Sequence, residues 1–149
     1  MRASLRLVPT DTPYTGGPAG GPGSAPKSGN GKTLASTVLV VEDEILVRMP
    51  TAEYLRDSGY RVIEASNAAD AQAVFEAGEP IEIVFSDVNM PGDMNGVALA
   101  EWVLKEYPDV WVILTSAVPP AQGLSGMSFL PKPYAFETLL AQLKRLLGV

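Results

Sequence analysis

Hydrophobic positions in residues 37–149 alternate between two patterns. Short, nearly continuous runs of aliphatic and β-branched residues, such as TVLVVE at 37–42 and IEIVFSD at 81–87, are typical of strands buried on both faces. Longer segments with hydrophobic residues at helical spacing, such as NGVALAEWVLKEYP at 95–108, lie between them. The pattern predicts strands over 37–42, 61–66, 81–87, 110–116 and 128–132, and helices over 44–60, 67–78, 95–108 and 134–149.

This alternation predicts an α/β fold. Parallel strands joined by right-handed crossovers form a doubly wound five-stranded sheet with helices on both faces. One connection differs, because only about ten residues, roughly AVPPAQGLSG at 117–126, link the last two strands. A crossover that contains a helix needs at least about 10–12 residues, and Pro119 and Pro120 disfavour helix. We therefore expect the fourth helix to be shortened or absent.

The N-terminal segment, residues 1–35, has a different composition, with seven Gly, five Pro and few large hydrophobic residues. Such a segment cannot bury enough surface to offset its chain entropy, so we predict a disordered tail before a domain over 36–149. It contains GNGKT, which resembles the end of a nucleotide-binding loop. That loop requires a glycine five positions before Gly31, where Pro26 stands, and it opens a helix. We interpret GNGKT as part of a flexible linker.

Composition excludes several classes of function. The chain has no cysteine and no histidine, which excludes disulfides, zinc-thiolate sites, thiol catalysis and Ser-His-Asp triads. The net charge of −6 and the scattered basic residues argue against a nucleic-acid partner or an anionic membrane surface. No hydrophobic run approaches the roughly 20 residues of a membrane span. The absence of cysteine fits a cytoplasmic location.

Polar residues follow the predicted strands at their carboxyl ends, where sites lie in parallel α/β sheets. Crowded carboxylates require a counter-cation, and oxygen-only ligands favour a hard ion such as Mg²⁺. A carboxylate beside Mg²⁺, with an ammonium and a hydroxyl opposite, suits phosphoryl transfer to that carboxylate. The residues expected to converge are Glu42, Asp43 and Glu44 after the first strand, Asp87 after the third, Thr115 and Ser116 after the fourth, and Lys132 after the fifth.

The motifs VLVVEDE, SDVNMPGDMNG, ILTSA and FLPKPY occur in the order typical of one signalling family. Over about residues 37–148 the sequence resembles the CheY-like receiver domain of two-component response regulators. The resemblance implies a flavodoxin-like fold with strand order 2-1-3-4-5. It also implies a phosphoprotein of phosphorelay signal transduction rather than an enzyme, with chemistry limited to its own phosphorylation and dephosphorylation.

The resemblance assigns roles to the acidic residues. Asp87 is similar to the family's phospho-acceptor, which becomes 4-aspartylphosphate. Glu42 and Asp43 resemble the acid pair that holds Mg²⁺ together with Asp87, and the backbone carbonyl of Asn89 adds a further ligand. The first acid is Glu here, which has a longer side chain than the usual Asp.

The resemblance also assigns a switch. Ser116 is similar to the hydroxyl that moves onto the phosphoryl group, with Thr115 as the alternative, and Lys132 is similar to the counter-charge. Phe129, three residues before that lysine, resembles the aromatic residue that reports phosphorylation to the surface. The Lys132–Pro133 peptide bond is expected to be cis, as in relatives.

The expected partners follow from the missing histidine. A histidine kinase or a histidine phosphotransfer protein must donate the phosphoryl group, and an unknown downstream protein must respond to it. We expect a stand-alone receiver that acts through protein–protein contact, as a relay or as a phosphate sink. The altered 117–126 segment changes a face that relatives commonly use for output, and the loop from Asp87 to Gly96 is one residue longer than usual.

Two other functional hypotheses compete with the receiver domain. A phosphatase of the haloacid-dehalogenase type is disfavoured, because Asn89 stands where the second Asp of its D-x-D motif is required. A degenerate receiver that binds partners without being phosphorylated stays an open alternative.

Overall fold

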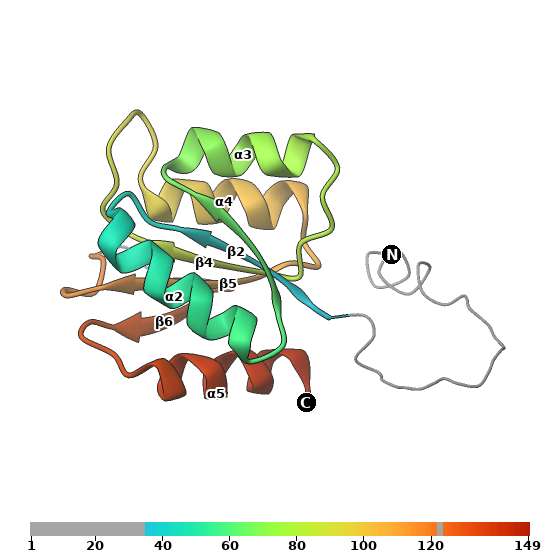
Figure 1. The fold of residues 1–149 in the computed structure, drawn as a ribbon. Coiled ribbons are helices and arrows are strands. Elements are labelled where there is room, and N and C mark those ends of the chain that lie inside the picture. The colour runs from blue at the N-terminus through green and yellow to red at the C-terminus, as the bar shows by residue number, and fades with distance from the viewer. Residues whose placement is uncertain (1–34, 122–123) are drawn as a thin grey trace, which may run out of the picture. The chain divides into compact units, whose positions relative to one another are not determined.

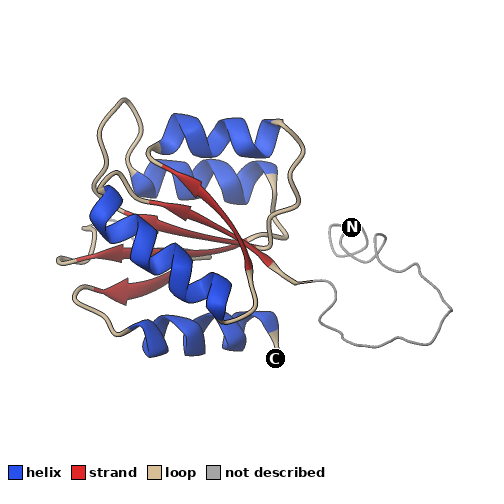
Figure 2. Cartoon of the chain, in the orientation of Figure 1, coloured by secondary structure: helices blue, strands red, loops and turns tan. Residues whose placement is uncertain are grey.

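Five parallel strands form a central sheet in the order β3-β2-β4-β5-β6, with two helices on each face (Figure 1, Figure 2). The computed structural model describes residues 35–121 and 124–149. The elements are β2 (Thr37–Val41), α2 (Ile45–Asp57), β3 (Arg61–Ala65), α3 (Ala68–Glu76), β4 (Ile83–Asp87), α4 (Gly96–Glu106), β5 (Trp111–Ser116), β6 (Ser128–Pro131) and α5 (Phe136–Leu147).

The predicted doubly wound fold and its strand order are confirmed. The elements are one to three residues shorter at their ends than the hydrophobic pattern predicted, because burial extends beyond regular pairing. Ile81, for example, is buried although β4 begins only at Ile83. The predicted tail and the GNGKT segment lie outside the described residues, apart from residue 35, so the division of the chain near residue 36 stays a prediction.

The expected loss of the fourth helix is confirmed for the residues that the structure describes between β5 and β6. Residues 117–121 and 124–127 form bends and turns. Gly126 has a φ of 81°, which favours glycine. Leu124 and Met127 pack against the hydrophobic core shared by the sheet, α3 and α4. Side chains of a short loop therefore cover the part of the core next to β6.

Side chains along each strand alternate between two cores. Val38 and Val40 of β2 pack with α2 and α5, whereas Leu39 and Val41 pack with α3 and α4. In β4 and β5, the odd-numbered residues Ile83, Phe85 and Ile113 face the α2/α5 side, and Val84, Val112 and Leu114 face the α3/α4 side. The same period of two decides on which face each polar residue at a strand end lies.

Candidate functional site

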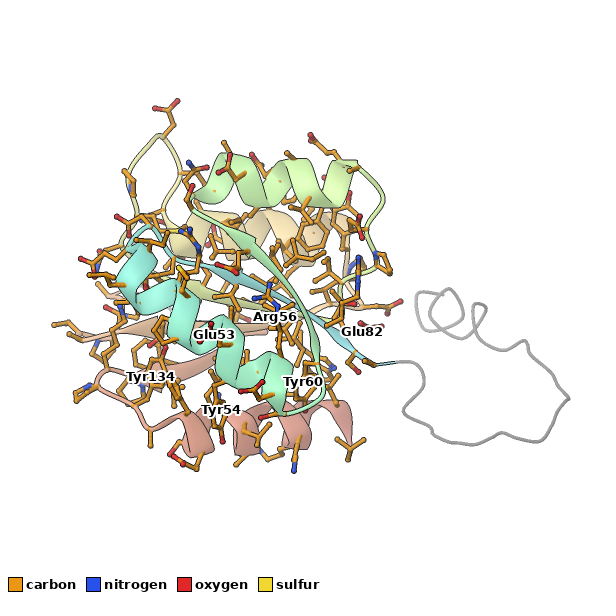
Figure 3. The ribbon with its side chains drawn as sticks, viewed as in Figure 1. Glu53, Tyr54, Arg56, Tyr60, Glu82 and Tyr134 are labelled. Atoms are coloured by element: carbon orange, nitrogen blue, oxygen red, sulfur yellow. The ribbon has the colours of Figure 1, made fainter. Side chains whose placement is uncertain are left out.

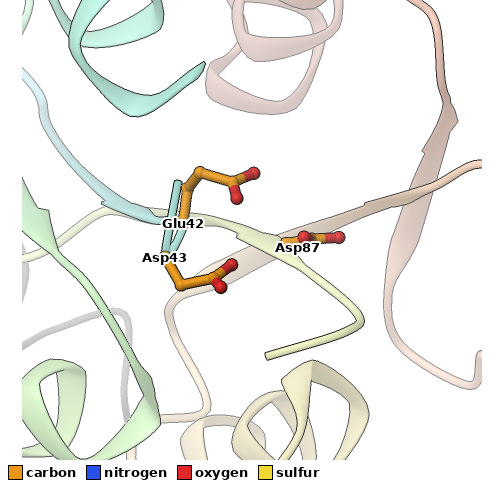
Figure 4. A group of neighbouring side chains, drawn as sticks. All are labelled: Glu42, Asp43 and Asp87. Atoms are coloured by element: carbon orange, nitrogen blue, oxygen red, sulfur yellow. The ribbon is translucent and has the colours of Figure 1, made fainter. Parts of the chain in front are cut away.

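Three carboxylates meet at the carboxyl edge of the sheet. Glu42 and Asp43 follow β2, and Asp87 is the last residue of β4. One oxygen from each lies within 4.8 Å of the others, and Figure 4 shows the three side chains turned toward a common space. Glu42 and Asp87 are buried, whereas Asp43 is exposed. The structure therefore brings together three of the four predicted acidic residues. Glu44 is exposed and its carboxylate is not part of this group.

Lys132 lies between two of these carboxylates. Its Nζ is 3.5 Å from Oε1 of Glu42 and 3.5 Å from Oδ2 of Asp87. Burial on its own lowers the pKa of Lys132, but the charges of Asp87 and Glu42 outweigh burial, and the net pKa is raised. The ammonium is therefore charged at neutral pH and compensates part of the negative charge. The Lys132–Pro133 peptide bond is cis, as expected.

The backbone around Glu42 is held by contacts that sequence reasoning missed. Arg48, one turn into α2, donates from its NH1 group to the carbonyl oxygen of Glu42 at 2.8 Å and pairs with Glu64 of β3 at 3.0 Å. The Glu42 side chain accepts the N–H of Glu44 at 3.1 Å. Burial raises the pKa of Glu42; the Glu44 hydrogen bond opposes this, and the charge of Asp87 adds to it. Arg48 thus links the acid pair to the neighbouring strand.

The two adjacent hydroxyls at the end of β5 have different surroundings. Both are buried. The Oγ of Ser116 accepts the N–H of Val118 at 3.3 Å, and its carbonyl accepts the N–H of Lys132 at 3.0 Å. Thr115 follows Ile113 on the α2/α5 side by the period of two, and Ser116 follows Leu114 on the α3/α4 side. The two candidates for the switch hydroxyl therefore lie on opposite faces of the sheet.

Gly96, the first residue of α4, packs directly on the backbone of Asp87. A Cβ at this position would overlap the Asp87 carbonyl oxygen and lie 2.8 Å from Cα of Val88. The Gly96 N–H donates to the carbonyl of Val88 at 2.8 Å. The absence of a side chain thus lets α4 approach the site and fix the turn after Asp87. The sequence pattern marked Gly96 only as the end of the loop.

Two further residues, Asn89 and Phe129, were predicted to take part in the site, and no contact in the structure tests their roles. Asn89 is exposed, two residues beyond Asp87. Phe129 is half-buried and packs against the α3/α4 core. The metal-ligand role of Asn89 and the switch role of Phe129 stay predictions.

The donor set fits Mg²⁺. Three carboxylates from two strand ends offer oxygen ligands only, and hard divalent cations prefer such ligands. One lysine cannot neutralise three carboxylates, so a divalent cation would relieve the remaining repulsion. Glu42, Asp43 and Asp87 are the side chains that would hold it.

A hydrophobic groove lies beside the site. It measures about 640 Å³ and is lined by Leu46 and Pro50 of α2 and by Pro133, Tyr134 and Phe136 before and in α5, with Lys132 at one end. Figure 3 shows Tyr134 next to α2. The first turns of α2, from which Leu46 lines the groove, expose three large hydrophobic side chains. They are Ile45 (51% exposed), Leu46 (86%) and Met49 (47%).

The family model of the response regulator receiver domain matches residues 38–144. The chain therefore belongs to the family of response regulator receiver domains of two-component systems, which are signalling phospho-acceptors that bind Mg²⁺ through an acidic pocket.

Two curated relatives are similar over most of the described chain. The sensor kinase CckA of Brucella abortus is 37% identical over 122 residues, which are 76% of this chain and 13% of that kinase. The transcriptional regulatory protein PdtaR of Mycobacterium tuberculosis is 33% identical over 109 residues, 69% of this chain and 52% of that protein. The chain thus spans from about an eighth to about half of the length of these relatives.

A solved structure has the same fold. The response regulator protein TrrA from Thermotoga maritima, in complex with Mg(2+)-BeF, has a TM-score of 0.68 and 30% identity. The match covers 74% of this chain and 98% of that one. Within the part of the chain that the structure describes, none of the helices has the length and hydrophobicity needed to cross a membrane.

Proposed function

We propose that this chain accepts a phosphoryl group on Asp87 from a histidine kinase or a histidine phosphotransfer protein, in a Mg²⁺-dependent reaction. The observation that carries the proposal is the position of the Asp87 carboxylate, next to Lys132 at 3.5 Å and within 4.8 Å of the acid pair. This set of charges matches what a carboxylate nucleophile and an incoming phosphoryl group require.

The transfer uses the chain's own groups in defined roles. An oxygen of the Asp87 carboxylate attacks phosphorus, the bond from phosphorus to the donor's imidazole nitrogen breaks, and the imidazole leaves with its electron pair. The ammonium of Lys132 turns from the carboxylates to the oxygens of the new acyl phosphate. Mg²⁺, when bound, neutralises negative charge on the transferred group.

Ser116 is our preferred switch hydroxyl. Leu114 and Ser116 lie on the α3/α4 side of β5, and Phe129 packs against the same core. Leu114 is also paired with Phe129 in the sheet. A movement of Ser116 toward the phosphoryl group therefore frees space on the side where Phe129 lies. Thr115 faces the opposite core, which leaves it without access to Phe129.

Output through a partner protein is the mode that we propose for this domain. Action as a relay between histidine proteins or as a phosphate sink stays part of the proposal. The cytoplasmic location expected from the cysteine-free sequence is part of it as well. The short connection between β5 and β6 supports a partner surface unlike that of receivers with a full fourth helix.

Intact-mass measurement after incubation with acetyl phosphate tests the proposal. We expect the wild-type chain to gain one phosphoryl group with Mg²⁺ and none with EDTA, because the carboxylates repel the anionic donor when no cation is bound. No gain under either condition, including with a histidine kinase as donor, would favour the degenerate receiver. Continuous release of inorganic phosphate with many turnovers would instead favour a phosphatase.

We expect the exposed hydrophobic side chains of α2, which are Ile45, Leu46 and Met49, to contact the protein that donates the phosphoryl group. We predict that Leu46→Asp slows phosphoryl transfer from a histidine kinase at least about tenfold, because a charge would be desolvated in the interface. Labelling by acetyl phosphate, which needs no docking, should stay at the wild-type rate. Val149→Asp, at an equally exposed residue after α5, serves as the control. Equal slowing by both variants, or slowing with acetyl phosphate, would contradict the prediction.

A further inference from the structure

The hydroxyl of Thr115 is buried without a protein partner. Thr115 is 2% exposed, and among the described residues no group forms a hydrogen bond with its Oγ1. Buried hydroxyls are almost always hydrogen-bonded, either to protein or to ordered water, because leaving one unpaired is unfavourable. A valine would fill the same volume without this penalty, so the hydroxyl calls for an explanation.

Thr115 lines a small cavity that Glu42 and Asp87 also line. The other lining residues are hydrophobic residues of β2, β4 and α2 and the polar residues Arg48, Thr51 and Tyr134. It leaves about 10 Å³ for the centre of a water molecule, which is close to the room that one water needs. A cavity of this size, lined by an unpaired hydroxyl and by carboxylate-bearing residues, has the properties of a buried-water site.

We propose that one water molecule occupies this cavity and connects the Thr115 hydroxyl to the carboxylate of Glu42. The water accepts the O–H of Thr115 and donates to a carboxylate oxygen of Glu42. Thr115 is therefore a positioning residue for the Glu42 side chain, which also accepts the Glu44 N–H, while Arg48 holds the backbone carbonyl of Glu42.

Two observations make Glu42 a suitable acceptor for this water. Glu42 and Thr115 follow Val40 and Ile113, so both lie on the α2/α5 side of the sheet. A carboxylate offers about four lone-pair sites. The Glu42 carboxylate therefore keeps acceptor capacity beyond its contacts with the Glu44 N–H at 3.1 Å, with Lys132 at 3.5 Å and with Asp43. A partner that orients a metal-binding carboxylate strengthens metal binding.

The consequence for metal binding rests on the proposed function, in which Glu42 holds Mg²⁺. The test compares Thr115→Val, which keeps the shape and removes the hydroxyl, with Thr115→Ser, which keeps the hydroxyl. Titration calorimetry with Mg²⁺ on the full chain should show affinity about tenfold weaker for Thr115→Val and close to wild type for Thr115→Ser. Wild-type affinity in both variants, or equal loss in both, would overturn the proposal.

Thermal unfolding in EDTA separates this proposal from the proposed function. If the water is present, the Thr115→Val variant lacks the hydrogen bond between the hydroxyl and the water. We then expect the melting temperature of Thr115→Val to fall below that of Thr115→Ser. If the hydroxyl is simply unpaired, Thr115→Val removes a buried polar group, and the melting temperature should rise, which would overturn the proposal. The comparison of melting temperatures tests the buried water even if the wild-type chain binds no Mg²⁺ and accepts no phosphoryl group.

Discussion

Replacing Asp87 by Asn is expected to abolish the Mg²⁺-dependent gain of a phosphoryl group from acetyl phosphate. The amide that replaces the carboxylate is neutral and has no anionic oxygen to attack phosphorus, so labelling should fall below detection by intact mass. The fold should survive, since the amide keeps the shape of the side chain. We also expect a higher melting temperature in EDTA, because one of three mutually repelling carboxylates is removed.

Asp93→Asn provides the matched control for this experiment. Asp93 is exposed in the loop between β4 and α4, so the variant carries the same change of charge only a few residues away. It should be labelled at the wild-type rate. Labelling of Asp87→Asn, or loss of labelling in Asp93→Asn with its fold intact, would show that Asp87 is not the acceptor.

Gly96→Ala is expected to destabilise the domain by about 3 kcal/mol, near the upper end for overpacking by a single methyl group. The added Cβ would meet the carbonyl of Asp87 and Cα of Val88, and these are backbone atoms that cannot rotate away. Either α4 or the end of β4 must shift, and both movements displace the acceptor carboxylate. Urea denaturation measures the loss of stability, and acetyl phosphate labelling of the folded fraction should be slower as well.

The control for this prediction is Gly92→Ala in the same loop. Gly92 has a φ of 103°, and an added Cβ would have no neighbour within 4 Å. Its cost is therefore backbone strain alone, about 1 kcal/mol. Equal losses of stability in the two variants would show that close packing on Asp87 is not what requires glycine at position 96.

The sheet and the carboxylate cluster could be predicted because each depends on local signals. Hydrophobic runs identify the strands, and parallel pairing brings the strand ends together, so Asp87 and Lys132 are expected to meet wherever the separating helices lie. The absence of the fourth helix could also be predicted from the sequence, since Pro119 and Pro120 stand in a connection too short for a crossover helix.

Contacts that depend on how helices pack could not be predicted. Arg48 reaches the Glu42 carbonyl only because α2 is rotated to place it there, and nothing in the sequence distinguishes it from the other five arginines. The sequence indicates that a helix begins near Gly96, but it does not show the close approach of Gly96 to Asp87, which depends on the position of α4. The sequence favours Ser116 over Thr115 as the switch hydroxyl, and this choice stays a prediction. The structure adds that the two hydroxyls lie on opposite faces of the sheet.

The alternation of faces at the strand ends restricts how this domain can change length during evolution. A one-residue insertion or deletion within β5 would exchange the faces of Thr115 and Ser116, because successive side chains point to opposite sides. One slip would put the threonine on the Phe129 side and the serine beneath the acids. A change of length in a loop, such as the one from Asp87 to Gly96, does not exchange the faces of strand residues. Length variation among relatives should therefore accumulate in this loop and between β5 and β6, while the strand ends stay free of insertions and deletions.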